Sequence, residues 1–444
     1  MRIQSKNMIK FFAALAVLLT MSVVSTMAQI TEKAEFGKFA ITNATIHTVS
    51  NGVINNGTVL IDGEKISFVG ENVRITPDFK RVDATGKHVY PGFIDSGTFL
   101  GLDEVSLVPV TIDSRELGDL NPQVRAFTAI NPSSVLIPVT RVNGVTNVIA
   151  HPRSGLIAGR ATFIDLFGYS PDSMALAPNA ALHVEWPSAL PRNRFDRRSK
   201  KAVESGYKKN LKTLADFWSQ AKFYNEMMTA YEADPKGKTR PDKNIKFDAM
   251  RDVFAGKLSV MITVNKADDI LNALKWIKEN EGINFILSSV AEGWRVADEI
   301  AEAGVPCLVG PTLRTPSRQY DNYQRPYQNP GLLHKAGVKV AIRTGETENT
   351  RNLLYNAGYA ATYGLGTEEA LKAVTINPAE IFGLADKIGS IDVGKNANLF
   401  ITDGDPFETM TTVEAVFIRG YKIPMTSRHT QLFEEYYNRD VRSN

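Results

Sequence analysis

Short apolar runs with the spacing of β-strands occur near both ends of the chain. Residues 38–90 contain several of them, and residues 388–424 contain two more, at 398–401 and 413–419. Asp62-Gly63 separates two runs of the first group, and this dipeptide is typical of a tight hairpin turn. Both ends of the chain are therefore predicted to form β-structure.

The middle of the chain alternates between strand-like and helix-like patterns. Apolar runs predict strands at 260–264, 285–287, 305–309 and 338–342. The segments 267–279 and 292–303 between them have helical periodicity. Strands and helices that alternate at this spacing favour parallel βα units, and a stretch of about 290 residues of them is typical of a closed barrel.

Residues 191–256 interrupt the alternation with a charged segment that contains interleaved aromatic residues. Its apolar positions, among them Leu211, Leu214, Phe217 and Trp218, recur at helical spacing. The pattern predicts a helical insertion with a basic, solvated outer face. A nucleic-acid-binding arm is the alternative, but near-balanced charge over the whole chain provides no basic field for nucleic acid.

The first residues have the three-part pattern of a secretory signal peptide. A basic start with Arg2, Lys6 and Lys10 precedes the apolar run at 11–19, and Thr26-Met27-Ala28 resembles a cleavage site. An uncleaved anchor is the alternative, but the run is shorter than the about 20 residues that span a membrane. We expect residues 1–28 to be removed, and the mature protein to be periplasmic or extracellular without a stable membrane span.

Composition narrows the chemistry. The chain has 444 residues, of which 43% are hydrophobic and 22% are charged, as in globular proteins. Its 51 basic and 48 acidic residues differ by the three basic residues of the leader. The single cysteine, Cys307, excludes an intrachain disulfide and a Cys-rich metal site, and its apolar surroundings predict a buried side chain.

Histidines and carboxylates are the remaining candidates for a site. The six histidines form no HxH or HExxH motif, and no GxSxG, GxxxxGK[ST] or GxGxxG motif occurs. His151 follows the apolar run 145–150 and is the best single candidate, although a structural role is favoured for it. The carboxylates that could face a pocket are Asp95, Asp165, Glu292 and Glu346.

Several longer segments resemble the amidohydrolase superfamily, and most closely its exported imidazolonepropionase-like or prolidase-like members. They include VDATGKHVYPGFIDSGTFLG at 82–101, GVTNVIAHPRSGLIAGR at 144–160 and the stretch 352–408, which is the most specific. The resemblance implies an α/β fold with a (β/α)8 TIM-like barrel and a small β-sandwich formed by both chain ends. The expected organisation is the signal peptide at 1–28, sandwich strands at 29–90, the barrel at 91–385 with the insertion at about 191–256, and sandwich strands with the tail at 386–444.

The resemblance also implies where metal ligands would lie. Members of the family hold zinc or another divalent metal with histidines and an aspartate. The matching positions in this chain are Gly97, Phe99, Thr263, Asn265, Ser289 and either Gly345 or Glu346. A bridging lysine, where the family has one, corresponds to Asp165. Since none of these positions holds a histidine, no metal or other cofactor is expected; an oxygen-ligated site formed by Asp95, Asp165 and Glu346 is the alternative.

The sequence is compatible with three functions. The favoured one is a non-catalytic barrel that binds a small molecule, a second copy of the chain or an intact amidohydrolase. The second is a divergent hydrolase of non-peptide or dipeptide C–N bonds, in which Glu346 is the general base. The third is a surface interaction protein that uses the insertion at 191–256. Nucleic acid is not an expected partner.

Overall fold

The computed structural model describes residues 33–189, 197–237 and 239–439. The expected signal peptide lies outside these residues. The described chain divides into one compact unit at 34–425 and a second unit that contains helix α13 (Arg428–Tyr437). No helix in the described part of the chain is long and apolar enough to cross a membrane.

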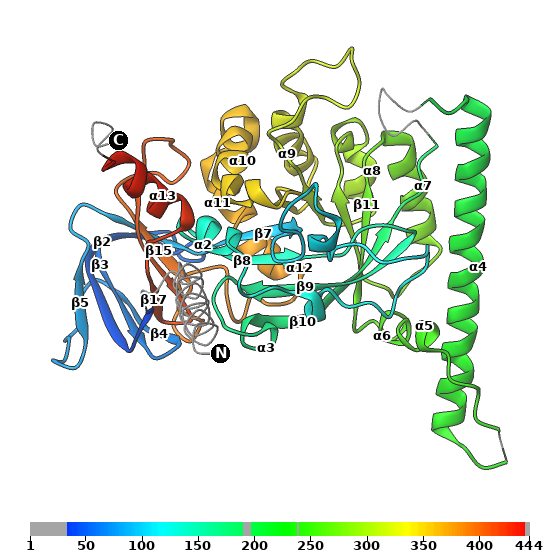
Figure 1. Ribbon diagram of the computed structural model, residues 1–444, viewed down its shortest axis with the longest axis horizontal. Helices are drawn as coiled ribbons and strands as arrows, with labels where there is room; N and C mark the ends of the chain where they lie inside the picture. Colours follow the sequence, from blue (N-terminus) through cyan, green and yellow to red (C-terminus); the bar gives the residue numbers. More distant parts are fainter. Residues whose placement is uncertain (1–32, 190–196, 238, 440–444) are drawn as a thin grey trace, which may run out of the picture. The chain divides into compact units, whose positions relative to one another are not determined.

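The central feature is an eight-stranded barrel (Figure 1). Its strands are β7 (Phe93–Thr98), β8 (Val145–Ala150), β9 (Ile157–Asp165), β10 (Ala175–Glu185), β11 (Ser259–Val264), β12 (Phe285–Ser289), β13 (Cys307–Val309) and β14 (Val340–Ile342). Neighbouring strands pair in sequence order. Between the first and last strands, the Ser96 hydroxyl donates to the Ile342 carbonyl at 2.9 Å, and Gly345 N–H donates to the Gly97 carbonyl at 2.9 Å. The predicted barrel is confirmed.

One strand departs from the all-parallel arrangement that the βα pattern predicts. β9 pairs antiparallel with both β8 and β10, whereas the other neighbours in the barrel are parallel. Only residues 151–156 join β8 to β9. A parallel crossover needs a dozen or more residues, so this short connection requires the antiparallel direction.

Helices follow the parallel strands of the second half of the barrel. They are α7 (Ala267–Lys278), α8 (Ala297–Glu302), α9 (Arg325–Lys335), α10 (Leu353–Ala360), α11 (Thr367–Ala373) and α12 (Ile376–Ile381). The short helices α2 (Leu136–Arg141) and α3 (Pro171–Met174) flank β8 to β10. α7 confirms the helix predicted at 267–279.

The helix predicted at 292–303 is shorter than expected. It consists of a 3-10 turn, η3 (Gly293–Arg295), followed by α8. The Glu292 carboxylate is buried and accepts hydrogen bonds from Ala267 N–H and from Arg318, at 3.1 Å and 2.6 Å. Glu292 therefore caps the start of α7 and pairs with Arg318, which gives it a structural role.

Strands from both ends of the chain form one nine-stranded sheet, in which the blue and the orange strands of Figure 1 lie together. The members are β1 (Glu35–Phe36), β2 (Lys38–His47), β3 (Val53–Asp62), β4 (Lys65–Gly70), β5 (Lys80–Asp83), β6 (His88–Pro91), β15 (Leu399–Thr402), β16 (Val413–Ile418) and β17 (Tyr421–Ile423). Phe39 and Phe417 meet edge to face in its core, with ring centroids 5.3 Å apart. The predicted β-structure from both chain ends and the hairpin at Asp62-Gly63 are confirmed.

The charged insertion forms the long helix α4 (Lys200–Ala233), which stands alongside the barrel (Figure 1). Short helices α5 (Ile245–Asp248) and α6 (Arg251–Phe254) lead from it to β11. The inner face of α4 is buried in the barrel's outer core through Leu214, Phe217 and Trp218. The charged residues at 191–196 lie outside the described chain.

Candidate functional site

A buried arginine occupies the carboxyl ends of the barrel strands. Arg343 directly follows β14 and is 3% exposed. Its Nη1 donates to the Ser288 hydroxyl of β12, and its Nη2 donates to His151 Nε2 at 2.8 Å. Burial lowers the pKa of the guanidinium, and the Asp95 and Glu185 carboxylates oppose that shift. An arginine remains charged under these conditions, so the barrel holds a fixed positive charge in its interior.

Two neutral histidines lie beside the guanidinium. The His151 and His183 rings are 4.5 Å apart, and both Nδ1 atoms lie within hydrogen-bond distance of the Pro152 carbonyl, at 3.1 Å and 2.6 Å. A carbonyl can only accept, so the hydrogen of each ring lies on Nδ1. Burial lowers the pKa of His183 to about 3 and the pKa of His151 well below its usual value. Each Nε2 is therefore an acceptor, which Arg343 uses on His151.

Asp95 supplies negative charge in the same region. Its carboxylate is fully buried and accepts hydrogen bonds from Gly97 N–H at 3.0 Å and from the backbone and hydroxyl of Thr344. Burial raises the pKa of Asp95 to about 6, and these hydrogen bonds and the charge of Arg343 oppose the shift. Asp95 thus partly offsets the charge of Arg343 within the barrel.

Two positions that match family metal ligands border the guanidinium. A Cβ added to Gly97 would lie 2.8 Å from Arg343 Cζ, and one added to Gly345 would lie 3.5 Å from Nη2. Of the two alternatives for the eighth-strand aspartate, Gly345 therefore faces the interior. Glu346 and Gly345 both line a small cavity beside Phe99.

Two of the other matched positions contact the histidines. Phe99 meets the His151 ring edge to face, with centroids 4.9 Å apart, and the Thr263 hydroxyl donates to His183 Nε2 at 2.8 Å. Asn265 accepts a hydrogen bond from Ala291 N–H at 3.4 Å. At the end of the sixth strand, Ser288 contacts Arg343, and Ser289 follows it with a left-handed φ of 70°.

A small cavity on the rim contains Glu346. Its volume is about 130 Å³, and its lining includes Phe99, Arg153, Glu346 and Glu348. Arg153 covers the Phe99 ring at 4.2 Å and pairs with Asp103 at 2.6 Å. Burial and the charge of Glu348 raise the pKa of Glu346.

The structure does not bring Asp165 to this site. Asp165 pairs in register with Asn147 near the start of β8, whereas His151 follows the other end of that strand. Its carboxylate accepts from Asn147 and Asn398 at 2.7 Å and 2.8 Å and lies 3.3 Å from Arg419 Nε. Asp165 joins the barrel to the nine-stranded sheet, so an oxygen-ligated site that combines it with Asp95 and Glu346 is excluded.

The residues at the strand ends do not fit a divalent metal. Among the described residues, no three His, Cys, Asp or Glu side chains converge in a way that could hold a metal ion. The His151 lone pair that a metal would use accepts from Arg343, and the guanidinium lies beside the ligand position at Gly97. A second cation at this point would meet electrostatic repulsion in a medium of low dielectric constant.

Alanine at position 97 tests this packing. Gly97→Ala is expected to lower the free energy of unfolding by about 1–3 kcal/mol, because its methyl group would overlap a guanidinium held by two hydrogen bonds. Gly206→Ala is the matched control, since Gly206 lies in α4 with open space around its Cα. Alanine there should stabilise the helix by up to about 1 kcal/mol. Denaturant unfolding measures both, and equal stabilities of the two variants would contradict the packing.

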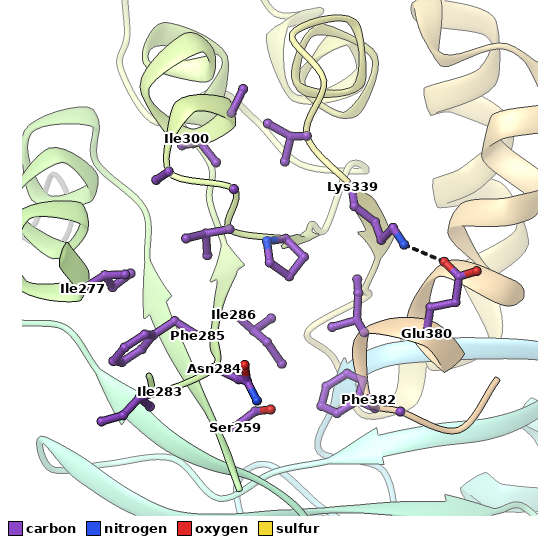
Figure 2. Close-up of a pocket in the computed structure, with 18 of the residues that line it drawn as sticks. Ser259, Ile277, Ile283, Asn284, Phe285, Ile286, Ile300, Lys339, Glu380 and Phe382 are labelled. Atoms are coloured by element: carbon purple, nitrogen blue, oxygen red, sulfur yellow. Dashed lines mark hydrogen bonds and ion pairs between the residues drawn. The ribbon is translucent and has the colours of Figure 1, made fainter. Parts of the chain in front are cut away.

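A second cavity lies at the opposite ends of the strands. It has a volume of about 780 Å³ and is lined by residues that precede or begin β11 to β14. Figure 2 shows apolar side chains such as Ile283, Phe285 and Phe382 along its walls, and Lys339 bonded to Glu380 at one edge. The amino-terminal face of such barrels serves stability, so this cavity is not the candidate active site.

Sequence reasoning missed three residues of the site: Arg343, Ser288 and His183. Arg343 follows a short apolar run, which is equally typical of a surface cation at a strand end. Its partners Ser288 and His151 are 55 and 192 positions away in the chain. One feature of the sequence could have indicated a buried long side chain: two of the matched ligand positions are glycines. Glycines at strand ends leave room for a long side chain from a neighbouring strand.

Comparisons with known proteins agree with the fold. A sequence model of the Amidohydrolase family matches residues 327–423. The chain is 26% identical to an imidazolonepropionase of Shouchella clausii, over 81% of this chain and 82% of the relative. It is 24% identical to a 5'-deoxyadenosine deaminase of Methanobrevibacter smithii, over 83% and 86%. Its fold is similar to that of an amidohydrolase from Thermotoga maritima, with a TM-score of 0.76, 27% identity and coverage of 88% and 100%.

Proposed function

We propose that this chain, which belongs to the amidohydrolase superfamily among its imidazolonepropionase-like and prolidase-like members, is an exported, metal-free member. Its relatives hydrolyse C–N bonds, whereas we propose that this protein binds its ligand without hydrolysing it. The observation that supports this proposal is the position of the Arg343 guanidinium, which is bonded to His151 and adjoins the ligand position Gly97. The family's chemistry depends on a divalent metal that polarises the substrate and activates water. Without it, the proposed role of the barrel is to bind a small molecule or a partner subunit.

The surroundings of the site limit its remaining chemistry. His151 and His183 are neutral, and the lone pairs of their Nε2 atoms accept hydrogen bonds from Arg343 and Thr263. A general base needs a free lone pair within reach of the proton that it removes. Neither histidine meets that condition, so neither supplies a general base.

Assays of the purified full chain test the absence of hydrolysis. We expect no turnover above the uncatalysed rate on a panel of amides, dipeptides and cyclic ureas, with or without added zinc or manganese. An active imidazolonepropionase assayed in parallel on its own substrate is the control. Turnover of any panel member by the purified chain would contradict the proposal.

One observation favours a second candidate function, hydrolysis with Glu346 as general base. Glu346 lines the rim cavity beside Phe99, and its raised pKa makes its carboxylate a stronger base. If turnover is found, Glu346→Gln should abolish it, whereas Glu348→Gln, at the neighbouring carboxylate, should leave most of it. Equal activities of the two variants would exclude Glu346 as the base.

A further inference from the structure

Three glycines from separate strand ends form the space that Arg343 occupies. Gly97 follows Ser96 in β7, Gly310 follows β13, and Gly345 follows β14. A Cβ at Gly310 would lie 2.0 Å from the Arg343 carbonyl oxygen and 3.3 Å from its Cγ, and one at Gly97 would lie 2.8 Å from Nε. The backbone at Gly97 and Gly310 therefore lies close against Arg343, and a Cβ at Gly97 would overlap its guanidinium.

Two of the three guanidinium nitrogens have an acceptor. Nη1 points to the Ser288 hydroxyl and Nη2 to the His151 lone pair, while Nε has no hydrogen-bond partner among the described residues. The Pro152 carbonyl fixes His151 in the tautomer that accepts. The planar fork of a guanidinium can reach both acceptors together, which the single ammonium of a lysine cannot do equally well.

We propose that the Arg343 guanidinium is a tethered replacement for the family's divalent cation. It places a positive charge at the strand ends and joins β8, β12 and β14 through His151, Ser288 and its own backbone. The inference rests on the proposed loss of the metal and not on the absence of hydrolysis. Removal of the side chain should consequently leave a binding site for a small, planar, free cation.

Chemical rescue with guanidinium ion tests this site. Arg343→Gly should melt at a lower temperature than the natural protein, and low-millimolar guanidinium chloride should raise its melting temperature by about 3 °C or more, because the ion binds only the folded state. Tetramethylammonium chloride at the same concentration should have no such effect, since it has no hydrogen-bond donors. Arg251→Gly is the control variant, because Arg251 pairs with Glu232 near the surface and leaves no enclosed space.

The outcomes separate clearly. Rescue of Arg343→Gly alone supports the tethered cation, whereas no rescue, or equal rescue of Arg251→Gly, would overturn it. If Arg343→Gly does not fold, Arg343→Lys and Arg343→Met are compared with the natural protein instead. The melting temperature should be highest for the natural protein, lower for Arg343→Lys and lowest for Arg343→Met. An Arg343→Met variant as stable as the natural protein would overturn the proposal. Turnover by the natural protein would contradict the proposed function and leave the rescue result unaffected.

Discussion

Replacement of Arg343 by methionine is expected to lower the free energy of unfolding by about 3–5 kcal/mol at about pH 8. Methionine fills much of the same volume and spares the desolvation of a charge, which favours the variant. Against this, His151 Nε2 and the Ser288 hydroxyl lose their partner in a buried site, and Asp95 loses a nearby positive charge. An unsatisfied buried polar group costs about 1–3 kcal/mol, so the losses exceed the gain.

The loss of stability in Arg343→Met should depend on pH, because the Asp95 carboxyl gains or loses a proton in this range. Burial raises its pKa from 3.8 to about 6, so the folded state binds a proton that the unfolded state releases between these values. The corresponding stability is fully present below about pH 4 and is lost as pH rises through 6. Without the positive charge of Arg343, this pKa rises further. The methionine variant should therefore approach the natural protein at about pH 5 and fall furthest below it at about pH 8.

Denaturant unfolding at the two pH values measures this effect. Asp95→Asn is the second substitution to combine with Arg343→Met. An asparagine oxygen can accept from Gly97 N–H, and its amide can donate to Thr344. The double variant should recover part of the loss at the higher pH. A methionine variant whose deficit is the same at both pH values would contradict the charge balance between Arg343 and Asp95.

Trp218→Ala is expected to lower the free energy of unfolding by about 3–5 kcal/mol. The indole is 4% exposed and meets Phe254 and Trp276 edge to face, at 5.3 Å and 4.7 Å. Its Nε1 donates to Asn280 at 2.8 Å. Truncation opens a large cavity between α4 and the barrel and removes this hydrogen bond.

Phe223→Ala on the same helix is the control for the tryptophan variant. Phe223 is 61% exposed, so its truncation should change stability by no more than about 0.5 kcal/mol. Thermal or denaturant unfolding compares the two. If Trp218→Ala were as stable as Phe223→Ala, α4 would not be part of the barrel's core. The expected result assigns the inner face of α4 to stability, so any partner of the insertion would contact its outer face.

The sequence predicted more of the architecture than of the site. Alternating strands and helices predicted the barrel, and β-rich runs at both ends predicted a shared sheet. The direction of β9 follows from the short connection at 151–156, a constraint that the βα pattern alone hides. Glu292 was predicted to begin a helix because the segment 292–303 has helical periodicity. In the structure its contacts with Arg318 and Ala267 outweigh helix propensity, and the helix begins later.

The motifs predicted which positions match the family's ligands but did not predict which side chain lies between them. Gly97 was predicted as an emptied position and Gly345 as one of two alternatives for another, and both adjoin the guanidinium. Arg343 could not be found in this way, because its burial depends on β7, β8 and β12 meeting in space. His183 was not predicted either, because no local pattern in the sequence links it to Thr263, which is 80 positions away. Convergence of this kind is a property of the closed barrel and of no local pattern.

Elemental analysis of the purified full chain tests the central claim most directly. A divalent metal needs several converging ligands, and here a guanidinium adjoins one ligand position and binds the His151 lone pair. The account predicts less than about 0.1 zinc, manganese, iron or nickel ion per chain after purification in metal-containing medium. About one tightly held divalent ion per chain would contradict it.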